Sequence, residues 1–249
     1  MTSKSNGITF ATKKDVRLWA SHRRGSVNRQ DCWRAGQKLA LTVQNSICSK
    51  ADPDSLPFTL LQQSQRRKPK LQEQTKLYCQ KKSTHHLTVA GFLPMPGEID
   101  LRPTMDLFLR LGASVIVPRL GKDGRGLAWG AYAEGEIIHR STLSHLPDDP
   151  SGGILSAQKL SQADLIFVPS FAIDQAGYRI GRGAGWYDRA LTYASPSAIL
   201  AGVVWPEEFL GKGESLPQSI PQSIPHDSWD IALTAALLPD KWVWLGSGI

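Results

Sequence analysis

The chain has 249 residues, of which 41% are hydrophobic and 20% are charged, and its formal net charge is +7. A chain of this length buries about 70–75% of its unfolded surface, so we expect a packed core rather than disorder. No apolar run approaches the roughly 18 residues that cross a bilayer, and the N-terminus lacks the apolar stretch of a secretory signal. The three cysteines have no CxxC spacing, which argues against a disulfide framework and a zinc site. We therefore expect a cytoplasmic protein that does not span a membrane.

The positive charge is concentrated near the N-terminus. Residues 1–85 hold 17 Lys and Arg against 5 Asp and Glu, whereas residues 86–249 hold 12 against 17. This asymmetry predicts that the N-terminal third meets an anion, which leaves nucleic acid, a membrane surface and a polyphosphate as alternatives. A solvated helix face or a loose basic arm explains the same charge without any partner, and an organelle transit peptide is a further alternative.

The N-terminal part reads as helical and basic. We expect a flexible tail over residues 1–10, and helical spacing over 15–41 that is interrupted near Gly25 and Ser26. Residues 49–83 are polar and contain several prolines, which favours surface helix and loop.

A strand–helix–strand unit follows. Residues 87–93 predict a strand, residues 101–112 a helix that ends at Gly112 as a C-cap, and residues 114–118 a buried strand. This order predicts a parallel sheet covered by helices.

The rest of the chain continues the same alternation. The further expected elements are a hairpin over 127–133 and 136–139 around Gly135, a strand over 163–169, a helix over 186–192, a strand over 198–205, an extended loop over 215–225, and a strand or helix over 231–238. We therefore predict an α/β fold: a single three-layer domain over residues 11–249, with a mostly parallel sheet flanked by helices and a divergent, basic stretch over 26–86.

A glycine-rich loop after the strand at 163–169 is the segment most indicative of chemistry. Gly181, Gly183 and Gly185 lead into the helix expected at 186–192, so backbone N–H groups can converge there on an oxyanion. Arg179 and Arg182 flank the turn and suit phosphate oxygens. The loop matches neither the Walker pattern nor the GxGxxG fingerprint, so a turn without ligand is the alternative.

The same segment resembles the signature of the 5-formyltetrahydrofolate cyclo-ligase family. The positions in register are Pro169, Asp174, Gly177, Arg179, Ile180, Gly181, Gly183, Gly185, Tyr187, Asp188 and Leu191. Other segments match in the same order along the chain. The family's phosphate-gripping Lys and Arg fall on Lys13 and Arg17, its folate-binding strand and loop place Leu93 and Glu98 in the substrate positions, and Pro118-Arg119 ends the next strand. A second magnesium-linked carboxylate falls on Asp230.

The resemblance implies ATP-dependent closure of 5-formyltetrahydrofolate to 5,10-methenyltetrahydrofolate, with ADP and phosphate released and Mg²⁺ bound. It assigns catalysis to Arg182 and Tyr187 and the metal to Asp188 and Asp230. It assigns ATP to Lys13, Arg17, Arg179, Gly181, Arg182, Gly183, Ala184, Gly185, Trp186 and Tyr187. It assigns the folate to Leu93, Glu98, Trp186 and Tyr187. The expected partner is this small molecule alone, bound by a monomer without nucleic acid or membrane.

Simpler roles remain open for several of these residues. Asp188 is alternatively a helix cap, and Asp230 a turn-forming residue with Asp227 as the rival ligand. Glu98 is alternatively a solvated loop acid, and Trp186 and Tyr187 are alternatively core aromatics.

The sequence also departs from the family pattern. Trp186 replaces a tyrosine, Ala184 stands where some members have Lys, Thr234 stands where Asp is common, and Ser170 replaces a common Gly. These departures leave open a relative that binds ATP but acts on another substrate or is inactive. A basic nucleic-acid-binding protein is the alternative from another class.

Overall fold

The computed structural model describes residues 12–48, 86–120, 126–135, 150, 152–210 and 223–246. The expected tail over 1–10, the polar segment over 49–83, the hairpin strand over 136–139 and most of the loop over 215–225 lie outside these residues. Within the described ranges, no helix combines the length and the apolar character that crossing a membrane requires.

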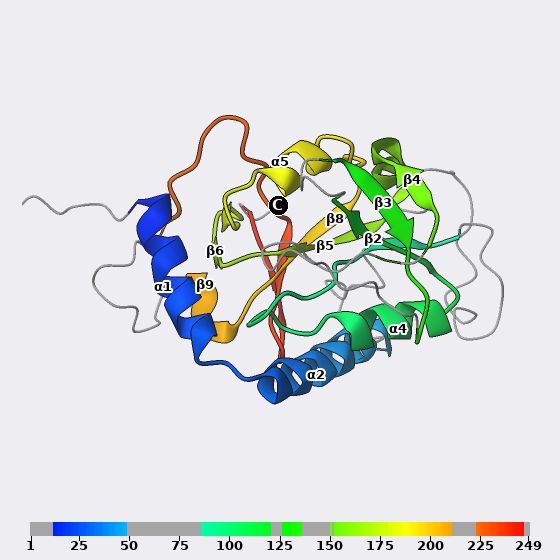
Figure 1. Cartoon of the computed structure of the whole chain (residues 1–249), viewed down its shortest axis with the longest axis horizontal. Coiled ribbons are helices and arrows are strands. Elements are labelled where there is room, and N and C mark those ends of the chain that lie inside the picture. The colour runs from blue at the N-terminus through cyan, green and yellow to red at the C-terminus, as the bar shows by residue number, and fades with distance from the viewer. Residues whose placement is uncertain are drawn as a thin grey trace, which may run out of the picture.

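A large sheet runs through the centre of the molecule (Figure 1). Its strand order is β11-β10-β8-β5-β1-β2-β3-β4. The strands are β1 (Thr88–Ala90), β2 (Ser114–Arg119), β3 (Ala128–Ala131), β4 (Ile154–Ser156), β5 (Leu165–Pro169), β8 (Ile199–Val203), β10 (Ala235–Leu237) and β11 (Trp242–Trp244). The pairs β1–β2, β1–β5, β5–β8 and β8–β10 are parallel, and the antiparallel pairs β2–β3, β3–β4 and β10–β11 form the two edges. The mostly parallel sheet is therefore confirmed, and residues 231–238 contain a strand rather than a helix.

Helices cover both faces of this sheet. The helices are α1 (Lys13–Gly25), α2 (Arg29–Cys48), α4 (Arg102–Arg110) and α5 (Trp186–Leu191), with 3₁₀ segments η1 (Ala157–Gln162) and η2 (Pro206–Glu208). Side chains alternate between the faces along each strand. Val89 packs in the core that α2 and α4 share, whereas its neighbour Ala90 packs in the core that contains α5. Figure 1 shows α2 and α4 on one side of the sheet and α5 on the other, so the expected helix–sheet–helix arrangement is confirmed.

The break between the first two helices lies where the sequence predicts it. Thr12 and Asp15 form a reciprocal capping box at the start of α1, and α1 ends at Gly25. The Oδ1 atom of Asn28 accepts the backbone N–H of Asp31 at 2.8 Å and so caps the first turn of α2. Helix α4 ends at Arg110 with Leu111 as its C-cap, and Gly112, the expected C-cap, lies one residue further on, with the left-handed φ of +84° that is common after a helix.

A second, smaller sheet lies beside α1 and was not expected. It consists of β6 (Ala172–Asp174), β7 (Arg179–Ile180) and β9 (Phe209–Leu210) in the order β7-β6-β9. Val16 and Ala20 of α1 pack against this sheet in an apolar cluster of their own. The glycine-rich segment is thus a short hairpin, β6–β7, followed by a loop. The sequence pattern does not predict these strands, because they are only three and two residues long.

Candidate functional site

A cavity of about 360 Å³ lies where several strands of the large sheet end. Its wall includes Phe92 and Leu93 beyond β1, Pro118 at the end of β2, and Ser170 and Phe171 beyond β5. Ligands of open α/β sheets bind outside the carboxyl ends of the parallel strands, and this cavity has that position. All the residues that the sequence analysis assigned to ATP, folate, catalysis or metal line it: Lys13, Arg17, Leu93, Glu98, Arg179, Gly181, Arg182, Gly183, Ala184, Gly185, Trp186, Tyr187, Asp188 and Asp230.

The glycine loop connects β7 to α5 along one side of the cavity. Gly183 has φ +99° and Gly185, the N-cap of α5, has φ +62°, which are left-handed conformations that residues with a Cβ rarely adopt. The carbonyl of Gly181 accepts the Nε–H of Arg17 at 2.9 Å. This hydrogen bond holds α1 against the loop.

Lys13 faces the loop that contains Asp227 and Asp230. Its Nζ lies 2.6 Å from Asp230 Oδ2 and 3.2 Å from Asp227 Oδ2. Partial burial lowers the pKa of Lys13, but the hydrogen bonds to the two carboxylates outweigh it and the pKa is raised. Partial burial raises the pKa of Asp230, but hydrogen bonds from Lys13 and from the backbone of Asp227 outweigh it, and the pKa is lowered. Of the two carboxylates, Asp230 lines the cavity and Asp227 does not.

Asp188 holds a buried arginine. Its Oδ1 lies 2.5 Å from Arg179 Nη2, and α5 has no side-chain cap at its first turn. The Asp188 carboxylate therefore binds a cation rather than capping the helix. Burial lowers the pKa of Arg179, although the charge of Asp188 opposes this effect. The sequence predicts Arg179 beside phosphate, whereas in this structure its guanidinium pairs with Asp188.

Glu98 lies in the loop beyond β1 and is buried, which is at odds with a solvated loop acid. Its Oε2 accepts the backbone N–H of Met95 at 3.0 Å, and its Oε1 accepts Arg182 Nη2 at 3.2 Å. Arg182, predicted for phosphate, is therefore paired with the carboxylate predicted for folate.

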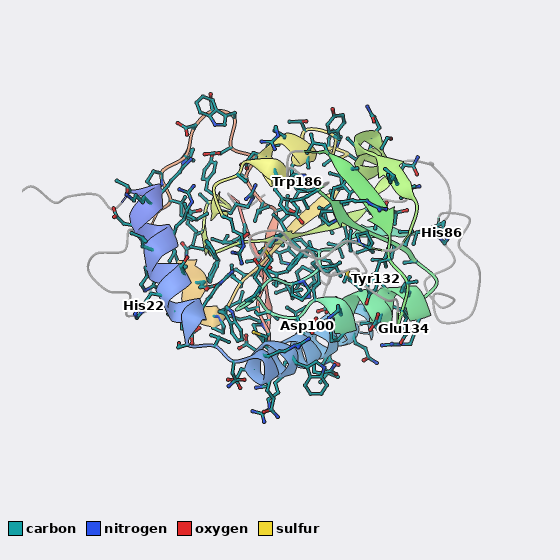
Figure 2. The ribbon with its side chains drawn as sticks, in the orientation of Figure 1. His22, His86, Asp100, Tyr132, Glu134 and Trp186 are labelled. Atoms are coloured by element: carbon teal, nitrogen blue, oxygen red, sulfur yellow. The ribbon has the colours of Figure 1, made fainter. Side chains whose placement is uncertain are left out.

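Two neighbouring aromatics begin α5. Trp186, labelled in Figure 2, is the first residue of α5. Its ring meets that of Trp129 of β3 edge to face, with 5.3 Å between the ring centroids. Its Nε1–H donates to the Gly126 carbonyl at 2.7 Å. The Tyr187 hydroxyl is buried and has no hydrogen-bond partner among the described residues, and burial raises the pKa of Tyr187. Trp186 thus belongs both to the core and to the cavity wall. The hydroxyl of Tyr187, by contrast, is a donor without a hydrogen-bond partner among the described residues.

Asp174 and Gly177, two positions of the signature, serve the architecture of the site. The Asp174 carboxylate accepts the backbone N–H groups of Tyr178 and Ile224 at 2.9 and 2.8 Å. Gly177 accepts the backbone N–H of Leu233 at 2.8 Å, and a Cβ on it would lie 2.3 Å from the Leu233 carbonyl oxygen. These contacts fasten the segment that carries Asp230 to the hairpin that leads to the glycine loop.

The chain is similar to known proteins over more than half of its length. The model of the 5-formyltetrahydrofolate cyclo-ligase family matches residues 59–239. The chain belongs to the 5-formyltetrahydrofolate cyclo-ligase family. A 5-formyltetrahydrofolate cyclo-ligase from Mycolicibacterium smegmatis is 34% identical over 62% of this chain and 74% of its own length. One from Escherichia coli is 29% identical over 63% of this chain and 81% of its own length.

Solved structures share the fold. The NMR structure of the Aquifex aeolicus 5,10-methenyltetrahydrofolate synthetase has a TM-score of 0.61 at 18% identity and covers 95% of this chain and 94% of its own. The Mycoplasma pneumoniae synthetase has a TM-score of 0.53 at 14% identity and covers 92% of this chain and 99% of its own. The family match includes residues 59–86, part of the stretch that we expected to diverge, and it begins after α1, which carries Lys13 and Arg17.

Several residues of the cavity wall have no assigned role in the family pattern, among them Arg24, Phe171 and Trp229. Of these, Trp229 is 70% exposed beside Asp230. The position of Arg24 could have been predicted, because it follows Arg17 by seven residues, about two helical turns, and so lies on the same face of α1. Phe171 and Trp229 lie in irregular segments, where no periodicity indicates which way a side chain points.

Proposed function

We propose that this enzyme of the cyclo-ligase family binds ATP at the glycine loop and 5-formyltetrahydrofolate beside it, and closes the folate to 5,10-methenyltetrahydrofolate. The observation that carries the proposal is that the side chains of Lys13, Arg17 and Arg182 line the same cavity as the buried carboxylate of Glu98. The cations suit a triphosphate, and the carboxylate suits the N–H donors of a pterin ring.

The chemistry explains the need for ATP. N10 of the folate must attack the formyl carbon on N5, but the oxygen of a formamide is a poor leaving group at neutral pH. Transfer of the γ-phosphoryl group of ATP to that oxygen forms an iminium phosphate at N5 and leaves ADP. N10 then attacks the activated carbon, its proton is lost, and the C–O bond breaks to release phosphate. The substrate supplies its own nucleophile, so the protein's task is positioning and charge neutralisation.

The phosphates are proposed to lie against the glycine loop. The N–H groups over residues 181–185, which include Ala184, face them, and Lys13, Arg17 and Arg182 neutralise their charge. Lys13 would then exchange Asp230 for phosphate oxygens, and Arg182 would exchange Glu98 for them. Arg179, held by Asp188, contributes positive charge from a buried position.

The carboxylates of Asp188 and Asp230 are proposed to hold Mg²⁺. Both line the cavity, and each is now paired with a cation, Arg179 and Lys13 respectively. Magnesium binds through one or two carboxylates together with phosphate oxygens and waters, so this donor set fits without a third acidic ligand. Within the described residues, no group of three or more His, Cys, Asp or Glu is placed to hold a metal. When bound, the ion would neutralise charge on the transferred phosphoryl group.

The pterin is proposed to lie between Leu93 and the aromatic pair Trp186 and Tyr187, with Glu98 accepting hydrogen bonds from its ring nitrogens. The buried hydroxyl of Tyr187 has no partner among the described residues, so it can donate to the folate or to the transferred phosphoryl group. Arg182 and Tyr187 are accordingly the proposed catalytic residues, because both would contact the reacting atoms.

We propose further that residues 11–249 act as one domain and as a monomer in the cytoplasm, on a small molecule alone. Size-exclusion chromatography with light scattering tests the monomer, since a mass of twice 27.3 kDa would contradict it. Binding of an oligonucleotide that survives physiological salt would contradict the absence of a nucleic-acid partner.

Purified protein incubated with 5-formyltetrahydrofolate and MgATP tests the activity through the absorbance of the methenyl product. We expect product formation that requires both ATP and a divalent cation, with one ADP formed per methenyl group. ATP binding without turnover would instead indicate a family member with another substrate.

A further inference from the structure

A buried ion pair that the family resemblance does not include borders the cavity. Arg24, near the end of α1, forms a fork with Glu208 of η2: Nε lies 2.8 Å from Oε1 and Nη2 lies 2.6 Å from Oε2. The Arg24 side chain is 5% exposed and the Glu208 side chain is fully buried. Removing two charges from water is costly, so a buried pair of this kind is poor evidence of a purely stabilising role.

Contacts with Glu208, Ser170 and Phe171 fix the orientation of the Arg24 guanidinium group. Glu208 holds two of its nitrogens, and Nη2 also donates to the Ser170 carbonyl at 2.5 Å. The face of the group lies over the Phe171 ring, 4.4 Å from its centroid. The direction of the third nitrogen, Nη1, is therefore set by contacts that the other atoms make.

Nη1 is the nitrogen of Arg24 that has no hydrogen-bond partner among the described residues. Arg24 lines the cavity, and its Nη1 atom is buried. It lies 3.8 Å from Glu98 Oε1, outside hydrogen-bond distance. A buried charged donor that stays unpaired costs free energy, and a ligand acceptor in the cavity would remove that cost.

The chemistry of the folate identifies this acceptor, given the function proposed above. A carboxylate pairs with the two adjacent donors of a pterin, the 2-amino group and N3–H. The next atom along the same ring edge carries the 4-oxo oxygen, an acceptor that Glu98 cannot serve. We infer that Arg24 Nη1 donates a hydrogen bond to the 4-oxo oxygen of the reduced pterin, and that Glu208 is the residue that positions it.

Two contacts on neighbouring atoms fix how the ring is rotated in its own plane. N5, which carries the formyl group, is bonded to the ring carbon adjacent to the carbon with the 4-oxo oxygen. Arg24 and Glu98 together therefore set the direction in which the formyl oxygen points, and this direction determines whether it meets the γ-phosphoryl group.

The adjacent ion pair on the same helix offers a matched control. Arg23 Nη2 lies 3.0 Å from Glu207 Oε2, at a position where the glutamate side chain is 61% exposed, and neither residue lines the cavity. The test variant is Arg24→Met with Glu208→Gln, which leaves no uncompensated buried charge. The control is Arg23→Met with Glu207→Gln.

Three quantities are measured for each protein: the KM for 5-formyltetrahydrofolate, the KM for MgATP, and the inhibition constant of the 4-amino counterpart of the same folate. Loss of a hydrogen bond from a charged donor raises the folate KM of the test variant about 10- to 100-fold. The MgATP KM stays near the wild-type value. The preference for the 4-oxo over the 4-amino compound falls by the same factor, because an amino group cannot accept the Arg24 hydrogen bond. The control keeps the wild-type values.

An unchanged folate KM in the folded test variant overturns the inference. So does an unchanged preference between the two folates, or an equal rise in both KM values, since a merely structural role would act on both substrates. If circular dichroism shows that the test variant does not fold, Arg24→Lys gives the same measurements, because it keeps the charge beside Glu208 but lacks Nη1. Failure of the wild-type protein to bind the folate overturns the proposed function itself, and is thereby distinguished from failure of the Arg24 assignment.

Discussion

The ammonium of Lys13 lies 2.6 Å from the Oδ2 atom of Asp230, and so joins the first turn of α1 to a loop 217 residues further along the chain. The same oxygen accepts the backbone N–H of Asp227 at 2.8 Å. These two hydrogen bonds fix the position of the Asp230 carboxylate, which lines the cavity. In the proposed function, Asp230 would help to hold a magnesium ion, and Lys13 would pair with phosphate oxygens instead of with Asp230.

The first prediction distinguishes the role of Asp230 in turnover from that of Asp227. Asp230→Asn keeps the shape and one acceptor oxygen but removes the charge, so we expect turnover to fall about 100-fold or more. Asp227→Asn, the matched control, removes a carboxylate that does not line the cavity, and turnover should stay within about threefold of wild type because exposed ion pairs contribute little. Initial rates at saturating substrates decide between them. A larger loss for Asp227→Asn would reverse the metal assignment.

The second prediction concerns the pH dependence of stability. The folded pKa of Asp230 is lowered, so the stability contributed by the Lys13 pair is present above the unfolded pKa, ordinarily 3.8, and is lost as pH falls through the folded value. The raised pKa of Lys13 acts at the other end, where its contribution is lost as pH rises through the folded value, above the ordinary 10.5. Lys13→Met should therefore lower the free energy of unfolding by roughly 0.5–1 kcal/mol at pH 7.

That difference between Lys13→Met and wild type should vanish below the folded pKa of Asp230. Urea unfolding at pH 7 and at a series of acid pH values measures it. A difference that persists unchanged after Asp230 has been protonated would show that Lys13 acts through packing rather than charge.

The third prediction concerns Arg17. Its Nε–H donates to the Gly181 carbonyl, and its guanidinium lies near Gly183, so Arg17→Ala removes a cation from the phosphate side of the cavity. We expect the KM for MgATP to rise about 10- to 100-fold. The KM for the folate should change little. Arg29→Ala, at the start of α2, is the control. An unchanged nucleotide KM would count against placing the triphosphate at this loop.

How much of this could be predicted from the sequence depended on the length of each pattern. The helices over 15–41 and 101–112 and the strands over 163–169 and 198–205 carry several apolar residues with one periodicity, so they were located correctly. The β6–β7 hairpin has no clear sequence signal, because Ala172–Asp174 and Arg179–Ile180 are too short to show alternation. Its surroundings include contacts with Phe209 and Leu233, which lie far along the chain.

The composition of the site was easier to predict than its pairing. The signature located the cavity residues because glycines and charged residues at fixed spacing report on backbone conformation and charge. It did not reveal that Arg182 pairs with Glu98, or Arg179 with Asp188, because each pair forms only when the fold brings two segments together. Glu208 could not be predicted at all, since an acidic residue after Pro206 reads as an exposed turn until Arg24 is placed beside it.

The fourth prediction concerns Asp188. Asp188→Asn leaves an amide oxygen that still accepts from the buried guanidinium of Arg179, so we expect the far-ultraviolet circular dichroism spectrum to be that of the wild type. Turnover should fall about 100-fold or more, because the negative charge at the cavity is lost. Glu134→Gln, which alters an exposed pair with Arg110, is the control. Near-normal turnover for Asp188→Asn would refute its role as a metal ligand.

The last prediction tests the packing that holds α2 under the sheet. A Cβ on Gly36 would lie 2.0 Å from the carbonyl oxygen of Asp100, which is backbone and cannot move aside cheaply, whereas a Cβ on Gly25 would meet nothing within 4 Å. Gly36→Ala should therefore lower the free energy of unfolding by about 1–3 kcal/mol. Gly25→Ala should raise it by about 0.5–1 kcal/mol, because alanine favours the helix and restricts the unfolded chain. Urea unfolding followed by circular dichroism measures both, and equal effects of the two substitutions would mean that α2 does not approach Asp100 as closely as the structure shows.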